Sequence, residues 1–173
     1  MSSILVSLNG TTGNCALEDY PARSNRPAAV TYNNGEVQAC GGEDLEDADR
    51  CWRFDGSAWS SLPNSNQKHC YKDSPNVVMN DGWWVTGRLQ NGKSSCSSSS
   101  VSSEIYTENA WIPGPALPGD EYPKDSCVVN LNTTHTLLIG GGFPTPTNHV
   151  WLYDWSSQAW TRTGSLIQGR YRH

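Results

Sequence analysis

The fold of this chain is indicated by the sequence TLLIGG, residues 136–141, followed by Trp151-Leu152-Tyr153-Asp154 and by Trp160. This stretch reads as a strand ending in paired glycines, then a strand carrying an aromatic residue, then a strand carrying tryptophan. The same order occurs twice upstream, as VQACGG (37–42) with Phe54 and Trp59, and as WWVTG (83–87) with Tyr106 and Trp111. Recurrence at intervals of about 50 residues indicates a repeat architecture.

A turn signal precedes the second strand of each unit. The three signals are Asn33-Asn34-Gly35, Asn80-Asp81-Gly82 and the segment 130–134. Asn and Gly tolerate the positive φ that hairpin turns require, so each unit is predicted to contain four antiparallel strands. The chain has eight Trp, seven Tyr, sixteen Gly and ten Pro. This composition is typical of an all-β fold.

This order of residues resembles the kelch motif. The shared features are paired glycines after the second strand, an aromatic on the third, a Trp on the fourth, and then Arg and His, as in Gly169-Arg170-Tyr171-Arg172-His173. The middle unit departs from the motif, because Gly87 stands alone and Thr107 replaces the Asp found at positions 55 and 154. The resemblance implies β-propeller blades, with Trp59, Trp111 and Trp160 packed between them and glycines relieving crowding near the axis.

The blade count predicts an open ring. A kelch unit has about 50 residues and closed propellers have about four to eight blades, so the chain supplies about three and a half. We expect residues 1–20 to end a preceding blade, 21–68, 69–124 and 125–168 to form three blades, and 169–173 to start another. The chain is interpreted as a fragment, whose ring needs the remaining blades or another copy to close.

Composition excludes several classes of partner. The net charge is −5 and only 17% of residues are charged, which provides no field for nucleic acid. No apolar stretch approaches the roughly 20 residues of a membrane span, and no secretory signal is visible in Met1 to Leu8. Six Cys and the sequons at Asn9 and Asn132 nevertheless predict an oxidising, extracellular compartment, with both Asn as candidate glycosylation sites whose occupancy the sequence leaves open.

Cys40 and Cys51 are predicted to form a disulfide. Secreted invertebrate kelch proteins, which this chain resembles here, carry a cysteine pair bracketing the loop between strands two and three. Cys40 ends the second strand and Cys51 begins the third, so their Cα atoms are expected about 4.5 to 5.5 Å apart. The pairing of the remaining cysteines stays open: Cys15, Cys70, Cys96 and Cys127.

The sequence contains only weak matches to motifs for nucleotide, calcium or zinc binding. Residues 87–94, GRLQNGKS, fit a phosphate-loop pattern, but the serine-rich segment behind them does not favour the helix that this motif requires. The acidic segment 43–49 lacks the Gly and terminal Glu of a calcium loop, and His69, His135, His149 and His173 have no zinc spacing. We therefore predict no catalytic residues, no metal and no cofactor. The copper radical oxidases resemble the chain in fold only, since none of their ligands can be matched here.

The leading functional hypothesis is a non-catalytic scaffold that binds a protein or glycan partner. Turns of an antiparallel blade alternate between two sides, so the loops joining strands two and three share one side with the connections between blades. Partner-binding candidates on that side are Glu43, Asp44, Glu46, Asp47, Asp49, His69, Arg88, Lys93, Arg170 and Arg172. Both sequons are expected on the opposite side. Alternatives are a structural or matrix assembly protein and a fragment of an oxidase-like propeller enzyme.

Overall fold

The computed structural model describes residues 19–22, 27–42, 46–69, 76–79, 82–86, 89–90, 103–118, 126–142 and 145–171. The helices and strands assigned in these residues are all strands, with no helix among them. Twelve of the strands form three four-stranded antiparallel sheets. The predicted all-β class and the four-stranded units are therefore confirmed. The described part of the chain contains no helix long and apolar enough to cross a membrane.

The first sheet contains β1 (Ala28–Thr31), β2 (Val37–Cys40), β3 (Cys51–Phe54) and β4 (Trp59–Leu62), in that spatial order. The turn between β1 and β2 closes where the Asn-Asn-Gly signal predicts it. The N–H of Tyr32 donates to the Glu36 carbonyl at 2.8 Å, and Gly35 has a φ of 84°. A residue without a side chain adopts this left-handed conformation at little cost.

The second sheet contains β6 (Asn76–Met79), β7 (Gly82–Thr86), β9 (Ser103–Thr107) and β10 (Ala110–Pro113). The expectation that Gly82 belongs to the turn is wrong, because Gly82 is the first residue of β7 and pairs with Met79. A Cβ at Gly82 would lie 1.8 Å from the carbonyl oxygen of Tyr106 on the neighbouring strand. Glycine is therefore required there by the close approach of two backbones.

The third sheet contains β11 (Cys127–Asn130), β12 (His135–Ile139), β13 (His149–Asp154) and β14 (Ala159–Ser165), again in sequence order. Its register shifts between Val150 and Trp151, which marks a bulge. Two short strands, β5 (Lys68–His69) and β8 (Leu89–Gln90), form a separate antiparallel pair that the repeat pattern did not predict.

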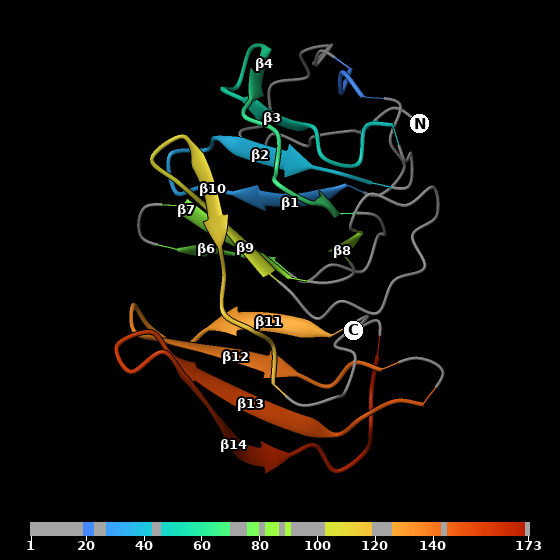
Figure 1. Cartoon of the computed structure of the whole chain (residues 1–173), viewed down its shortest axis with the longest axis vertical. Coiled ribbons are helices and arrows are strands. Elements are labelled where there is room, and N and C mark those ends of the chain that lie inside the picture. Colours follow the sequence, from blue (N-terminus) through green and yellow to red (C-terminus); the bar gives the residue numbers. More distant parts are fainter. Residues whose placement is uncertain are drawn as a thin grey trace, which may run out of the picture.

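The three sheets are arranged like blades. The strand contacts that join them run from β1 to β6 and from β6 to β11, which are the first strands of their sheets. Figure 1 shows β1, β6 and β11 in the middle of the molecule, with β4 and β14 at opposite ends. The fourth strands are therefore the outer edges, as expected for propeller-like blades, and the described sheets do not close into a ring.

The core lies between the sheets and is centred on two adjacent tryptophans of β7. Trp83 and Trp84 are both 0% exposed. Neighbouring residues of a strand point to opposite faces, so Trp83 packs in a cluster with Cys40 and Cys51 of the first sheet, whereas Trp84 packs against Leu138 of the third. Burial of both faces explains why β7 lacks the alternation of polar and apolar residues found in half-exposed strands.

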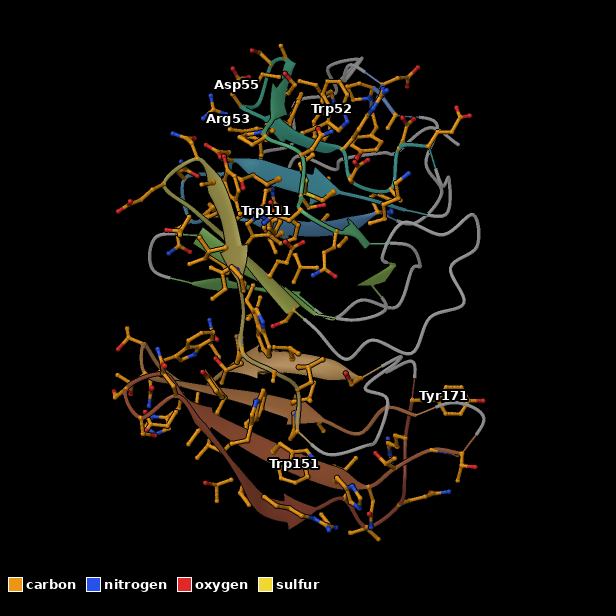
Figure 2. The ribbon with its side chains drawn as sticks, viewed as in Figure 1. Trp52, Arg53, Asp55, Trp111, Trp151 and Tyr171 are labelled. Atoms are coloured by element: carbon orange, nitrogen blue, oxygen red, sulfur yellow. A yellow bond between two sulfur atoms is a disulfide. The ribbon has the colours of Figure 1, made fainter. Side chains whose placement is uncertain are left out.

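The fourth-strand tryptophans link neighbouring sheets by a repeated hydrogen bond. The Nε1 of Trp111 donates to the Pro63 carbonyl at 3.0 Å, and the Nε1 of Trp160 donates to the Ala116 carbonyl at 2.7 Å. Each acceptor follows the fourth strand of the preceding sheet. Trp111 is 7% exposed and lies between β10 and the first sheet (Figure 2). The prediction of a buried position holds for Trp111, whereas Trp59 and Trp160 are only half-buried.

The paired glycines have a backbone reason in addition to the crowding expected near the axis. Gly41 and Gly42 follow β2 with φ angles of 66° and 130°, and Gly140 and Gly141 follow β12 with φ angles of 61° and 99°. The φ angles of Gly42 and Gly141 lie beyond the left-handed region of about 50° to 70° that residues with a Cβ can adopt, so these two positions require glycine. The glycine pair therefore turns the chain sharply out of the second strand of both sheets.

Candidate functional site

The described loops divide between two sides of the sheets, which Figure 1 shows at left and right. The hairpin face carries the short turns 33–35, 108–109, 131–134 and 155–158. The long-loop face carries the described segments 46–50, 63–67, 145–148 and 166–171. This division follows from the antiparallel order of the strands and agrees with the arrangement predicted from the sequence.

On the long-loop face, the acidic segment of the first sheet is tied to the chain that leaves β4. The N–H of Ser65 donates to the Asp49 carbonyl at 2.8 Å, and the Ser65 hydroxyl donates to the same oxygen at 3.3 Å. Asp47 forms an ion pair with Arg50, with 3.0 Å between Oδ1 and Nε. Glu46 is exposed, whereas Ala48 is fully buried and anchors the turn.

The corresponding loop of the third sheet is held in the same manner. The N–H of Gly141 donates to the Arg170 carbonyl at 2.8 Å, and the N–H of Arg170 donates to the Thr147 carbonyl at 3.0 Å. A Cβ at Gly169 would lie 2.7 Å from the Pro146 carbonyl oxygen, so the two segments approach closely. These bonds fix the backbone and leave the Arg170 side chain exposed.

The sequence-predicted partner residues are only partly placed. The structure brings Glu46, Asp47 and Asp49 together in one turn, and Arg170 belongs to the segment 166–171, which follows the last strand of the third sheet on the same face. His69 lies in β5. The remaining candidates lie outside the described residues: Glu43, Asp44, Arg88, Lys93 and Arg172. So does the sequon at Asn9.

The predicted disulfide between Cys40 and Cys51 is present. The two cysteines are 0% and 1% exposed and pair directly between β2 and β3, with their Cα atoms 4.1 Å apart. This separation is shorter than the expected 4.5 to 5.5 Å. The bond lies in the core cluster beside Trp83 and Trp111, and such buried disulfides are typical of proteins from oxidising compartments. Cys127 forms no disulfide with another described residue.

Two aspartates stabilise the turns between the third and fourth strands. Asp55 Oδ1 accepts hydrogen bonds from the N–H groups of Ser57 and Ala58 at 2.8 and 3.0 Å, and these bonds lower the pKa of Asp55 to about 2. Asp154 accepts from the N–H of Ser156 at 2.8 Å, which likewise lowers its pKa. Figure 2 places Asp55 at the edge of the first sheet. Both carboxylates therefore have a structural role.

The middle sheet explains why Thr107 can replace this aspartate. Its turn contains only Glu108 and Asn109, with φ angles of 49° and 61°. Two consecutive positive φ angles are the mark of a type I′ hairpin, whose twist matches that of the flanking strands. The connection is as long as that of the first sheet, because four residues separate Tyr106 from Trp111 as they separate Phe54 from Trp59, but here the ladder continues to the pair Thr107–Ala110. This backbone conformation closes the hairpin without an aspartate at position 107.

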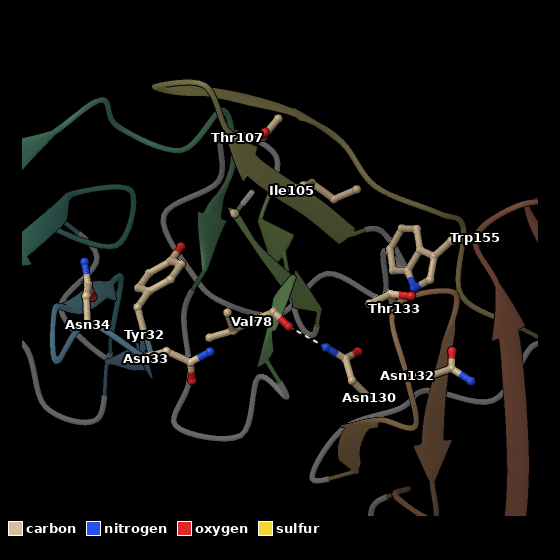
Figure 3. Close-up of a pocket in the computed structure, with 11 residues that line it drawn as sticks. Tyr32, Asn33, Asn34, Val78, Ile105, Thr107, Asn130, Asn132, Thr133 and Trp155 are labelled. Carbon is tan, nitrogen blue, oxygen red and sulfur yellow. Dashed lines mark hydrogen bonds between the residues drawn. The ribbon is translucent and has the colours of Figure 1, made fainter. Parts of the chain in front are cut away.

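Sequence reasoning missed a cavity of about 880 Å³ on the hairpin face. It is lined by residues from all three sheets, with the turn of each outer sheet contributing asparagines (Figure 3): Tyr32, Asn33, Asn34, Val78, Gly82, Ile105, Thr107, Asn130, Asn132, Thr133 and Trp155. The signal for it in the sequence is the clustering of asparagine in the first hairpin of two units. Within one repeat, turn chemistry accounts for these asparagines, and the packing of sheets that brings the turns together cannot be read from one repeat.

Asn130 closes the base of this cavity. Its Nδ2 donates to the Val78 carbonyl of the second sheet, and its Oδ1 accepts from the Thr136 hydroxyl at 2.7 Å. Thr136 Oγ1 in turn accepts from the Nε1 of Trp155 at 2.8 Å. This chain of hydrogen bonds joins the second and third sheets and fixes the Trp155 ring at the edge of the cavity.

Within the described residues, no group of three or more His, Cys, Asp or Glu side chains is placed to hold a metal ion. Leu89 and Gln90, from the phosphate-loop pattern, lie in strand β8. No protein-family model matches the chain, and no curated protein matches it.

Proposed function

We propose that the chain forms kelch-type blades of an extracellular, non-catalytic propeller scaffold whose long-loop face binds a protein or glycan partner. The observation that carries this proposal is the pair of backbone networks on that face. Ser65 is bonded to the Asp49 carbonyl, and Gly141 is bonded to the Arg170 carbonyl, both at 2.8 Å. Loops fixed in this way lose little conformational entropy on binding, which favours recognition over a flexible linker role.

Charge is the second support. The long-loop face combines an acidic turn, with exposed Glu46 and partly exposed Asp49, with the exposed Arg170 of another sheet. A surface with both signs of charge favours a partner of complementary pattern, and such charges set association rate and specificity more than total affinity.

The proposal of kelch-type blades is supported by residues that play equivalent roles in different sheets. Trp111 and Trp160 each donate a hydrogen bond to the preceding sheet, and Asp55 and Asp154 each stabilise the turn between the third and fourth strands of their own sheet. The buried Cys40–Cys51 bond supports an extracellular setting. Asn132 is exposed on a hairpin, where a sugar would leave the long-loop face clear.

The test begins by screening the purified chain against arrays of extracellular proteins and of glycans. Affinity for each protein ligand and each charged glycan found is then measured for Glu46→Lys and for Arg170→Glu at two salt concentrations. Glu108→Lys is the matched control, since Glu108 is an exposed carboxylate on the hairpin face. We expect both long-loop variants to change the affinity and its salt dependence, while the control does not. A change with Glu108→Lys alone would assign binding to the other face.

A further inference from the structure

The cavity on the hairpin face is lined by aromatic, aliphatic and polar side chains, as ligand-binding sites are. Tyr32 lies on one side and Trp155 on the other, with Val78 and Ile105 between them (Figure 3). Its volume of about 880 Å³ falls within the roughly 300 to 1,000 Å³ of small-molecule pockets. Three separate sheets contribute to it, so its shape depends on the whole blade arrangement.

The Trp155 ring is held in place by contacts within the protein. The Trp155 ring lies edge-on to Tyr153 and to Trp84, with centroids 4.7 and 5.8 Å away. Its Nε1 is held by Thr136, as described above. A preorganised aromatic ring offers apolar contact without losing rotamer freedom on binding.

The described residues that line the cavity are all neutral. Burial, followed by the nearby carboxylate of Glu36, raises the pKa of Tyr32 to about 12, so its phenol also stays neutral at physiological pH. The Tyr32 hydroxyl donates to Gln38 Oε1 at 3.4 Å. Asn33 and Thr133 extend from exposed turns on opposite sides of the opening.

Aromatic rings beside neutral amide and hydroxyl groups favour one chemical class of ligand over others. A phosphate, sulfate or carboxylate ligand calls for a cation, and the described lining supplies none. A purely apolar ligand would displace water from the polar side chains at the opening, Asn33 and Thr133, without replacing its hydrogen bonds, which is costly. A neutral sugar offers hydroxyl groups at its ring edge and C–H groups on its faces, and these match amides beside aromatic rings.

We propose that this cavity binds the end of a neutral oligosaccharide, with Tyr32 and Trp155 contacting the sugar faces and Asn33 and Thr133 bonding to its hydroxyl groups. The site lies on the face opposite to the long loops and does not depend on their function. Asn132, at the same opening, belongs to the sequon 132–134. An N-glycan there would begin beside the site, so binding must be measured on protein made without N-glycans.

The experiment is titration of the full chain, produced unglycosylated with its disulfide intact, with neutral trisaccharides of glucose, galactose, mannose and N-acetylglucosamine. Calorimetry gives affinity, and tryptophan fluorescence reports on Trp155. Asn33→Ala and Thr133→Ala change exposed turn residues and leave the core untouched. Asn64→Ala and Thr163→Ala are matched controls, because these residues are exposed and do not line the cavity.

We expect at least one neutral trisaccharide to bind with a dissociation constant below about 1 mM. Asn33→Ala and Thr133→Ala should each weaken that binding by at least about threefold, the effect of losing one hydrogen bond, while the controls leave it unchanged. The proposal is overturned if no neutral trisaccharide binds, if a sulfated trisaccharide or a neutral peptide binds more tightly, or if the cavity variants behave like the controls.

Discussion

Trp111 provides the sharpest test of how the sheets are held together. Its ring is 7% exposed and packs against Trp83 and Tyr106, with centroids 5.6 and 5.2 Å away. Its Nε1 donates to the Pro63 carbonyl of the preceding sheet at 3.0 Å. Two substitutions separate these contributions: Trp111→Ala removes both the ring and the hydrogen bond, whereas Trp111→Phe keeps an aromatic ring and removes the donor.

The magnitudes follow from burial. Trp111→Ala should lower the free energy of unfolding by about 3 to 5 kcal/mol, as truncation of a buried Trp usually does. Trp111→Phe should cost about 1 to 3 kcal/mol, chiefly because the Pro63 carbonyl loses its partner. For a chain of this size, each kcal/mol lost from the free energy of unfolding lowers the melting temperature by about 2 to 4 °C. The melting temperature of the alanine variant should therefore be roughly 6 to 20 °C lower than that of the parent.

The assay is urea and thermal unfolding followed by circular dichroism, with the disulfide kept oxidised. Ile112→Ala is the matched control, because Ile112 follows Trp111 on β10 but points to solvent and is 43% exposed. It should cost less than about 1 kcal/mol. If Trp111→Ala and Ile112→Ala cost the same, Trp111 does not hold the first and second sheets together, and the proposed packing of blades must be abandoned.

Replacing both Cys40 and Cys51 by alanine should lower the free energy of unfolding by about 2 to 4 kcal/mol, since their bond closes a short loop inside the core. Equal urea midpoints for the variant and the parent would contradict this. The pKa of Asp55 is lowered from 3.8 to about 2, so its contribution to stability is present above pH 3.8 and is lost as pH falls through about 2. Asp55→Asn should therefore flatten the acid part of a stability profile, and an unchanged slope would argue against the turn bonds. The pKa of Tyr32 is raised from 10.0 to about 12, so stability should fall as pH rises between these values, and Tyr32→Phe should reduce that fall in alkaline melts. An alkaline profile identical to that of the parent would mean that Tyr32 is not shielded from water.

The positions of most strands could be predicted because their signals are local. Asparagine and glycine mark the hairpins, and the aromatic that precedes each Trp fixes the register of the third and fourth strands. Phe54 faces Trp59, Tyr106 faces Trp111 and Tyr153 faces Trp160 in the structure. The predicted end of the second strand and start of the third also placed Cys40 opposite Cys51. Local turn chemistry and period-two alternation suffice for such pairs.

The cavity and the β5–β8 pair could not be predicted, because both depend on segments that lie far apart in the sequence. Lys68 pairs with Gln90, although the strands β6 and β7 of the middle sheet lie between these two residues in the sequence. Tyr32 and Trp155 share one cavity although they belong to the first and third sheets. A repeat pattern describes one blade at a time, so it carries no direct signal for what neighbouring blades enclose.

The adjacent Trp83 and Trp84 show how the order of the sheets could have been inferred. In a sheet with one wet face, two consecutive large aromatics on an inner strand would leave one of them exposed. Both are fully buried here because the first sheet covers one face of the middle sheet and the third covers the other. The residues at the same register in the outer sheets are Val37 with Gln38 and Thr136 with Leu137, which are smaller. The largest side chains therefore occupy the strand with a neighbour on both sides, where each buries its apolar surface and strengthens the contact between sheets.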